Sequence, residues 1–281
     1  MPRFRLIAAT ARMLTCVGCV STLAVASLAR AQTASSAEHV VTSTAVSLVQ
    51  DLPIEDGARQ RVLYVAPAGA LRGVIVMFPG GADELDIHSD GRIEHGDNFL
   101  VRTRDQWMAR GYAIVEVDAI DHQSMRGLRS QPAYARVTQT ILEFAARESG
   151  APVWVMGTSQ GSIAAVNAAA HASEASHLRG MILTESVSVL GASKETVFDP
   201  QPEAVRVRSL VVANDDDRCR VAPPSMADDI AKSLKNAPVE VLRVRGGTTQ
   251  TSNTCGSLSP HGYLGIENTV IDAIVAWMQK S

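Results

Sequence analysis

The sequence predicts a single α/β domain built on a mostly parallel central sheet flanked by helices, and three observations support this. Short, fully apolar segments recur along the chain after position 60. Segments with helical periodicity stand between several of these runs, and turn-forming residues such as Pro79–Gly81 and Gly150 mark boundaries. Strands that are buried on both faces and alternate with helices are typical of a parallel sheet.

Seven segments are predicted to be strands because each is a short apolar run rich in β-branched residues. They are 62–65, 74–78, 113–117, 153–156, 181–183, 210–213 and 239–242.

Four segments keep the spacing of a helix that packs on a sheet. They are 137–145, which ends before Gly150, then 160–171, 226–234 and 266–277. Residues 160–171 are Ala-rich and apolar nearly all round, which predicts a buried helix. The polar stretch 82–102 is predicted to be a functional loop. The stretch 186–203 could form a lid, but it is too short for a large cap domain.

Composition excludes several classes of protein. With 281 residues, of which 46% are hydrophobic and 20% charged, the chain is too apolar to be disordered. Beyond the N-terminus no apolar run approaches the ~20 residues of a membrane-spanning helix, which excludes a multi-span membrane protein. The formal net charge of −3 argues against a nucleic-acid partner.

The N-terminus has the features of a secretory signal peptide. A basic start is followed by the apolar, small residues 13–28, and Ala29-Arg30-Ala31 fits the small-x-small pattern of a cleavage site. We predict a signal peptide over 1–31, a flexible leader over 32–42 and one domain over 43–281. The protein would be exported to the periplasm or the exterior, without stable membrane insertion after cleavage. A retained membrane anchor is the alternative.

Cysteine usage agrees with export. Cys16 and Cys19 would leave with the signal peptide, so that only Cys219 and Cys255 remain. An even pair in an oxidising compartment predicts a disulfide bond. Two free buried thiols are the alternative.

The segment Gly157-Thr158-Ser159-Gln160-Gly161 matches G-x-S-x-G between a predicted strand and a predicted helix. This motif holds a serine on a sharp turn, and its glycines keep the turn free of clashes. The pattern predicts that Ser159 is a nucleophile. The alternative is a glycine-rich turn whose serine caps the helix.

A serine nucleophile needs a base, and the base needs an orienting acid. In this strand–turn–helix context the partners follow in the order serine, acid, histidine. His261, in the loop between the last predicted strand and helix, is the expected base, and His177 is the weaker candidate. The acid is expected among Asp215, Asp216 and Asp217, directly after strand 210–213; Asp199 and Glu185 are weaker candidates.

In these residues the chain resembles the α/β-hydrolase superfamily over about residues 60–281. The resemblance rests on Pro79–Gly81, on the Ser159 motif, on the three aspartates and on His261, in this order. The chain looks most like exported, esterase-like bacterial serine hydrolases of poorly defined substrate, partly through 98–102 and 259–263. The resemblance implies an α/β-hydrolase fold without a large cap domain.

The resemblance also favours Asp217 as the acid, with Asp216 second. Asp217 is followed by Arg218 and then by Val221-Ala222-Pro223, which is similar to the usual acid loop. Pro79 departs from the family pattern, since many relatives carry a histidine before the glycine.

An oxyanion hole requires two donors that face the developing negative charge. The first is expected to be the backbone N–H of Gln160, which follows the nucleophile. The second is expected from Gly81, with Ala82 as the alternative, because small residues let the backbone approach a substrate. A plain turn at Pro79–Gly81 is the other interpretation.

No pattern predicts a metal or another cofactor. His88, Asp90, Glu94 and His95 lie in the polar loop without a recognised ligand spacing. His122, with Asp118 and Asp121, is interpreted as part of a hydrated turn. No phosphate-binding glycine motif occurs, which argues against a nucleotide.

The sequence therefore predicts an exported serine hydrolase that cleaves carboxylic esters of small molecules through an acyl-enzyme. An acyltransferase or a peptidase with the same nucleophile is the first alternative. A secreted binding protein on a hydrolase scaffold, without catalysis, is the second. The sequence predicts no oligomeric state.

Overall fold

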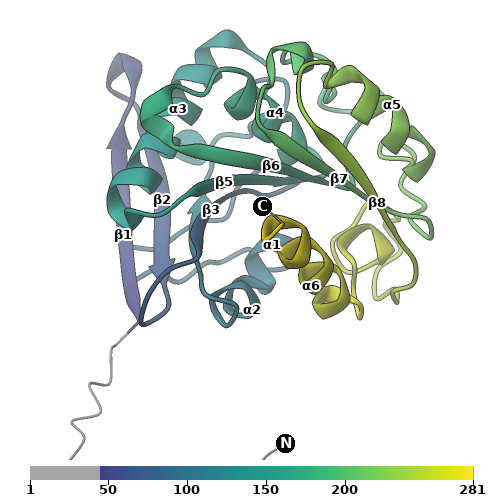
Figure 1. Ribbon diagram of the computed structural model, residues 1–281, viewed down its shortest axis with the longest axis horizontal. Helices are drawn as coiled ribbons and strands as arrows, with labels where there is room; N and C mark the ends of the chain where they lie inside the picture. The colour runs from purple at the N-terminus through teal and green to yellow at the C-terminus, as the bar shows by residue number, and fades with distance from the viewer. Residues whose placement is uncertain (1–44, 281) are drawn as a thin grey trace, which may run out of the picture. The chain divides into compact units, whose positions relative to one another are not determined.

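The computed structural model describes residues 45–280, which form one eight-stranded sheet with helices on both faces (Figure 1). The strands are β1 (Val46–Pro53), β2 (Arg59–Ala66), β3 (Gly73–Phe78), β4 (Tyr112–Val117), β5 (Val153–Thr158), β6 (Leu178–Thr184), β7 (Arg208–Asn214) and β8 (Val239–Val244). The helices are α1 (Phe99–Arg102), α2 (Arg104–Met108), α3 (Pro132–Ser149), α4 (Gly161–Ala170), α5 (Ala227–Ser233) and α6 (Glu267–Met278). The predicted signal peptide and leader lie outside the described residues.

The strand order is β1-β2-β4-β3-β5-β6-β7-β8. Only β2 runs against its neighbours β1 and β4, and the other adjacent pairs are parallel. The prediction of a mostly parallel sheet is confirmed. Because β3 and β5 to β8 are parallel, their carboxyl ends lie at one edge, where ligand sites of open α/β sheets occur.

Alternating side chains of each strand supply the two layers of the core. In β3, Val74, Val76 and Phe78 join the cluster beneath α3, α4 and α5, whereas Ile75 and Met77 join the cluster beneath α1, α2 and α6. Figure 1 shows these two groups of helices on opposite faces of the sheet. This double burial explains why the central strands are continuous apolar runs.

Local signals set the helix ends. Helix α3 has Pro132 at its first turn and ends at Gly150, whose left-handed φ of 59° lets its N–H bond to the carbonyl of Ala146. The stretch 82–102 is not wholly irregular as predicted. Asn98 accepts a hydrogen bond from the N–H of Leu100 (3.0 Å) and thereby caps the short helix α1.

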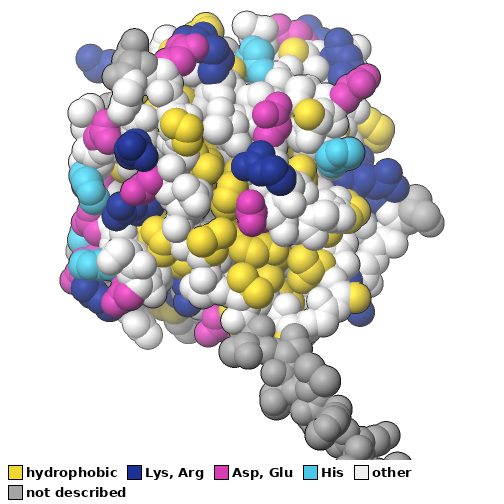
Figure 2. Space-filling model, turned by 90° about the vertical axis from the view of Figure 1, so that its left-hand side faces the viewer, with side chains coloured by type: hydrophobic (Ala, Val, Ile, Leu, Met, Phe, Trp, Pro, Cys, Tyr) yellow, Lys and Arg dark blue, Asp and Glu magenta, His cyan; other side chains and the backbone are white. Residues whose placement is uncertain are grey.

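All seven predicted strands and all four predicted helices are present, but β1 was not predicted. It is an edge strand whose side chains are mostly exposed or half-buried, so its sequence lacks an apolar run. Figure 2 shows the side of the molecule on which β1 lies, where a group of hydrophobic side chains is surrounded by acidic and basic ones.

The segment between β6 and β7 contains no helix beyond the 3-10 turn η4 (Pro202–Ala204), which confirms the absence of a large cap domain. Among residues 45–280, no helix has the length and apolar character needed to cross a membrane.

Glu116 is an acid inside the core. It lies on β4 opposite Leu63 and Met77, is fully buried, and neither carboxyl oxygen has a hydrogen-bond partner among the described residues. Burial raises the pKa of Glu116 to about 7, and the charge of Arg104 only partly opposes this. The folded state therefore favours the protonated acid.

We expect the Glu116 carboxyl to make stability fall as the pH rises. Between its ordinary pKa of 4.5 and about 7, the unfolded chain loses this proton while the folded chain keeps it, so the free energy of unfolding decreases. The loss is on the order of 3 kcal/mol. Urea unfolding of the wild type and Glu116→Gln from about pH 5 to about pH 8 measures it. The exposed Glu174→Gln is the control, and parallel curves for wild type and Glu116→Gln would contradict the prediction.

Candidate active site

Ser159 lies in the turn between β5 and α4 with a left-handed backbone, φ 53°. Its N–H donates to the carbonyl of Thr184 on β6 (2.9 Å), which anchors the turn. A Cβ at Gly157 would overlap the backbone of Gly161, and a Cβ at Gly161 would overlap the carbonyl of Phe78. Gly157 is therefore required because β5 is packed against the first residues of α4, and Gly161 because the turn is packed against the end of β3.

His261 reaches Ser159 from the 3-10 turn η6 (Pro260–Gly262), which precedes α6. Ser259 caps this turn, since its Oγ accepts the N–H of His261 (3.2 Å). The distance from His261 Nε2 to Ser159 Oγ is 2.9 Å. The other candidate base, His177, directly precedes the first residue of β6, at the opposite end of that strand from Ser159.

Asp217 follows β7 and contacts the other nitrogen of the His261 ring. The distance from Asp217 Oδ2 to His261 Nδ1 is 2.7 Å, and Asp217 Oδ1 accepts the N–H of Cys219 (2.7 Å). With Nδ1–H donating to Asp217, Nε2 is an acceptor for the Ser159 hydroxyl. Asp216 instead accepts the N–H of Gly246 (2.8 Å).

The carboxylates of two further acid candidates, Asp215 and Asp199, bind partners other than His261. Asp215 pairs with Arg243 and Arg245, and Asp199 accepts the N–H of Thr196. Of the three adjacent aspartates, Asp217 is thus the one whose carboxylate meets His261.

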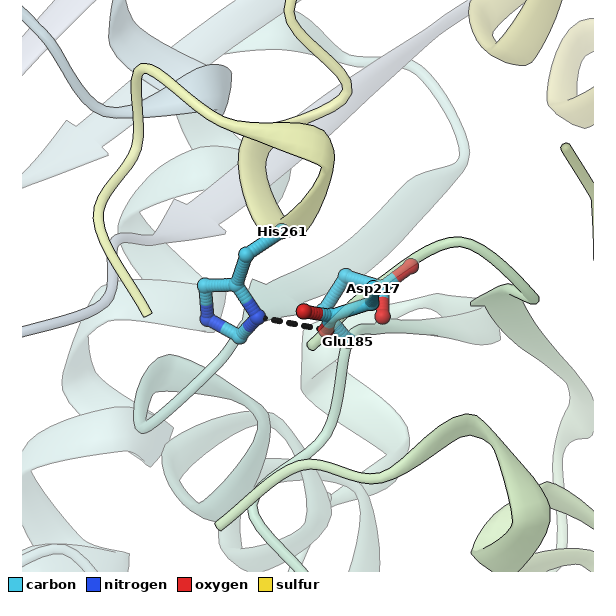
Figure 3. Close-up of side chains that lie close together, drawn as sticks. All are labelled: Glu185, Asp217 and His261. Carbon is cyan, nitrogen blue, oxygen red and sulfur yellow. Dashed lines mark hydrogen bonds and ion pairs between the residues drawn. The ribbon is translucent and has the colours of Figure 1, made fainter. Parts of the chain in front are cut away.

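Glu185, at the end of β6, is buried beside Asp217 and His261 (Figure 3). Its Oε1 accepts the N–H of Asn214 (2.7 Å). Burial, followed by the facing carboxylate of Asp217, raises the pKa of Glu185 well above its ordinary value, which the Tyr263 hydroxyl and the Asn214 N–H only partly oppose. Burial therefore favours the neutral form of Glu185, whose carboxyl lies beside Asp217 and His261. The sequence indicated Glu185 only as a weaker candidate for the acid.

The two candidate oxyanion donors lie near Ser159. Gln160 follows it directly, and Gly80, next to Gly81, packs so closely that a Cβ there would come 2.9 Å from Ser159 Cβ. Gly81 has a left-handed φ of 77°. Within residues 45–280, no hydrogen bond occupies the backbone N–H of Gln160, Gly81 or the alternative Ala82.

No protein-family model matches the sequence, and no match was found among curated proteins. Solved structures do match. A dienelactone hydrolase from Anabaena variabilis is 13% identical with a TM-score of 0.54, over 83% of this chain and 95% of that one. An α/β serine hydrolase without a lid from Xanthomonas campestris is 11% identical with a TM-score of 0.54, over 84% and 96%. Esterase 2 from Thermogutta terrifontis is 14% identical with a TM-score of 0.55, over 83% and 95%.

The chain has the α/β-hydrolase fold.

In this α/β-hydrolase fold, a disulfide joins the loop after β7 to the loop before α6. Cys219 and Cys255 are bonded, with Cα atoms 4.6 Å apart and 36 positions apart in the sequence. Cys219 is the residue whose N–H binds Asp217, and Cys255 lies on the segment that leads to His261. The bond therefore connects the segments that carry the candidate acid and the candidate base.

A cavity of about 640 Å³ opens beside Ser159 at the carboxyl edge of the α/β-hydrolase sheet. Its lining is mixed, and the apolar part comes from Ala82, Leu85, Phe99 and Val221, of which Leu85 and Phe99 are only 3% and 1% exposed. Titratable side chains form much of the rest, namely Asp83, Glu84, Glu94, His95, Asp97, Arg126 and His261.

The other histidine clusters make ordinary surface contacts. His88 and Arg92 both contact the Glu94 carboxylate, and His122 Nδ1 lies 2.8 Å from Asp86. Asp118 is a turn residue that accepts the N–H groups of neighbouring loops. Among the described residues, three potential metal-ligand atoms within 4.8 Å occur at Glu185, Asp217 and His261, where His261 and Asp217 already bind each other.

We expect Cys219→Ser with Cys255→Ser to lower kcat by about 3- to 10-fold, because displaced orienting groups slow the reaction. Loss of a loop closure of this length also costs roughly 4 kcal/mol in the chain-entropy model. Steady-state kinetics on a reactive ester and the rate of thermal inactivation test this. Ser209→Ala, at another buried position, on β7, is the control for a small substitution in this region, and it should keep the wild-type kcat. Unchanged kinetics with faster inactivation would mean that the bond stabilises only the fold.

Proposed function

We propose that this protein is a serine hydrolase that cleaves carboxylic esters. One observation carries the proposal most strongly: the two successive contacts Ser159 Oγ–His261 Nε2 (2.9 Å) and His261 Nδ1–Asp217 Oδ2 (2.7 Å). This arrangement lets a base receive the proton of a hydroxyl while a carboxylate stabilises the resulting imidazolium. The α/β-hydrolase fold and the esterases among its structural neighbours support the same reaction class.

In the proposed mechanism, Ser159 Oγ attacks the acyl carbonyl while His261 Nε2 takes the hydroxyl proton. The N–H groups of Gln160 and Gly81 stabilise the oxyanion. When the tetrahedral intermediate collapses, His261 returns the proton to the leaving alcohol. Water then attacks the acyl-enzyme while His261 takes its proton. The bond between the acyl carbon and Ser159 Oγ breaks, the carboxylic acid leaves, and His261 returns the proton to Ser159. Burial and the facing Asp217 carboxylate raise the pKa of Glu185 well above its ordinary value, so we assign the role of orienting acid to Asp217, which contacts His261 Nδ1 directly.

The cavity supports esters with short or polar acyl groups. Glu84, Glu94 and Asp97 place carboxylates along its wall, and Arg126 adds a cation. Apolar contacts are available at Ala82 and Val221, but a long alkyl chain would also meet these hydrated groups, so it would gain less from burial than in a wholly apolar channel.

We also propose that the protein is exported and that residues 1–31 are removed, so that the mature chain begins near Gln32. The basic and apolar N-terminal pattern supports this, and so does the Cys219–Cys255 bond, since disulfides persist in oxidising compartments.

Ser159→Ala is expected to abolish ester hydrolysis and covalent labelling by a fluorophosphonate, because it removes the attacking oxygen. Intact-mass measurement after labelling and an ester assay test both effects. Ser176→Ala, at a buried serine two residues before β6 whose hydroxyl donates to the carbonyl of Ser173, is the control for the substitution itself and should label normally. Labelling of Ser159→Ala at the wild-type rate would exclude Ser159 as the nucleophile.

Across p-nitrophenyl acetate, butyrate and laurate, kcat/KM is expected to be highest for the two short esters. Each methylene would contribute about 0.8 kcal/mol in a wholly apolar channel, and the carboxylates of the mixed cavity wall reduce this gain for a long chain. Rates measured below the micelle concentration of each ester test this. A steady rise in kcat/KM toward laurate would contradict the proposed substrate class while leaving the nucleophile unaffected.

A further inference from the structure

Arg129 is a buried cation close to Ser159 that has no role in the proposed mechanism. It precedes α3, and its side chain has no exposed surface. Its guanidinium contacts Asp83 Oδ2 through Nε (2.9 Å) and Nη2 (2.8 Å). Nη2 also donates to the carbonyl of Gly81 (2.8 Å), and Nη1 donates to Gln160 Oε1 (3.2 Å). One planar group thus joins the loop after β3 to the turn that carries Ser159.

The two residues that Arg129 joins to one another are those proposed to supply the oxyanion donors. A peptide unit is planar, so a fixed Gly81 carbonyl directly fixes the N–H of Ala82, the alternative donor, and it restrains the N–H of Gly81 through the two backbone dihedrals of that residue. Gly81 has a left-handed φ of 77° and a glycine's wide conformational freedom. The contact with Arg129 therefore restrains the loop at Gly81, the residue whose backbone dihedrals are intrinsically the most free.

The backbone that carries Arg129 is itself fixed. Asn167 on α4 donates from Nδ2 to the carbonyl of Arg129 (2.6 Å). Glu195 accepts the N–H groups of Gly127 and Ser130, each at 2.9 Å. Helix α4 begins directly after Gln160, so Arg129 is positioned by the same helix that follows the nucleophile.

Asp83 makes the burial of Arg129 possible. A buried cation without a partner carries a large desolvation cost, which the carboxylate offsets. Burial raises the pKa of Asp83 to about 6, although the Arg129 guanidinium lowers it in turn. Each member of the pair therefore depends on the other, and a test must separate the charge pairing from the contacts to Gly81 and Gln160.

We propose that Arg129 is a positioning residue for the oxyanion hole: it sets the loop after β3 at a fixed place relative to the Ser159 turn. This inference rests on the proposed serine-hydrolase function and adds a residue to it. Such positioning would lower the energy of the transition state, because donors that are already in place need no rearrangement when the oxyanion forms.

Arg129→Lys tests the proposal. Lysine keeps the positive charge for Asp83, but its ammonium cannot reproduce the planar fork that spans three acceptors. We expect kcat to fall by about 10- to 100-fold with little change in KM, since loss of a whole oxyanion donor costs about 100- to 1000-fold. The inhibition constant of phenylboronic acid, which forms a tetrahedral adduct with an active serine, should rise by a similar factor.

Arg61→Lys is the matched control. Arg61 also binds a carboxylate, Asp51, and a backbone carbonyl, Ile87, and none of these residues lines the cavity. Its kcat and inhibition constant should stay within about twofold of wild type, because the contacts that it loses do not hold an oxyanion donor.

The double variant Asp83→Asn with Arg129→Met separates positioning from stability. It removes both buried charges, and asparagine tolerates the left-handed φ of 65° at position 83. We expect a folded protein whose kcat stays low. Recovery of wild-type kcat by this variant, or wild-type kcat in folded Arg129→Lys, would overturn the inference. A wild type that neither hydrolyses esters nor reacts with a fluorophosphonate would overturn the proposed function itself, and the inference with it.

Discussion

The close approach of the Ser159 turn to the end of β3 is the constraint on which the rest of the site depends. Gly161 lies against the carbonyl of Phe78, and Gly80 lies against the side chain of Ser159. The left-handed backbone of Ser159 costs about 1–3 kcal/mol, and it persists because the neighbouring strands and helix determine the turn. The same approach brings the backbones of the two segments close together, as the proposed oxyanion hole requires.

Three buried carboxyl groups surround this turn, and the structure accommodates each in a different way. Asp217 lies between His261 and the N–H of Cys219, Asp83 faces the guanidinium of Arg129, and burial raises the pKa of Glu185 well above its ordinary value. Burying a charge without such compensation would cost several kcal/mol. The consequence is a defined arrangement: a carboxyl group contacts the histidine, and a compensated ion pair lies behind the proposed oxyanion donors.

Most of the fold could be predicted from the sequence because the central strands are buried on both faces and therefore consist of apolar runs. The sequence did not predict β1, whose edge position leaves no such run. The order of Ser159, the aspartates and His261 could be predicted because parallel strands bring their carboxyl ends together. Pattern alone could not choose among the three aspartates, since adjacent residues differ mainly in the direction of their side chains. Arg129 left no local signal, because its partners at 81 and 83 are more than 40 positions away.

The candidate acid and base segments are also joined without the disulfide. Asn214, the last residue of β7, donates from Nδ2 to the carbonyls of Gly246 (2.9 Å) and Pro260 (3.0 Å). These contacts hold the start of the acid loop against the turn that carries His261. The Cys219–Cys255 bond adds a second connection between the same segments, beside the N–H of Cys219 that binds Asp217 and next to the cavity that Cys255 lines. Because the Asn214 contacts remain when the bond is lost, the orienting groups should be displaced only partly, and the reaction should slow without being abolished.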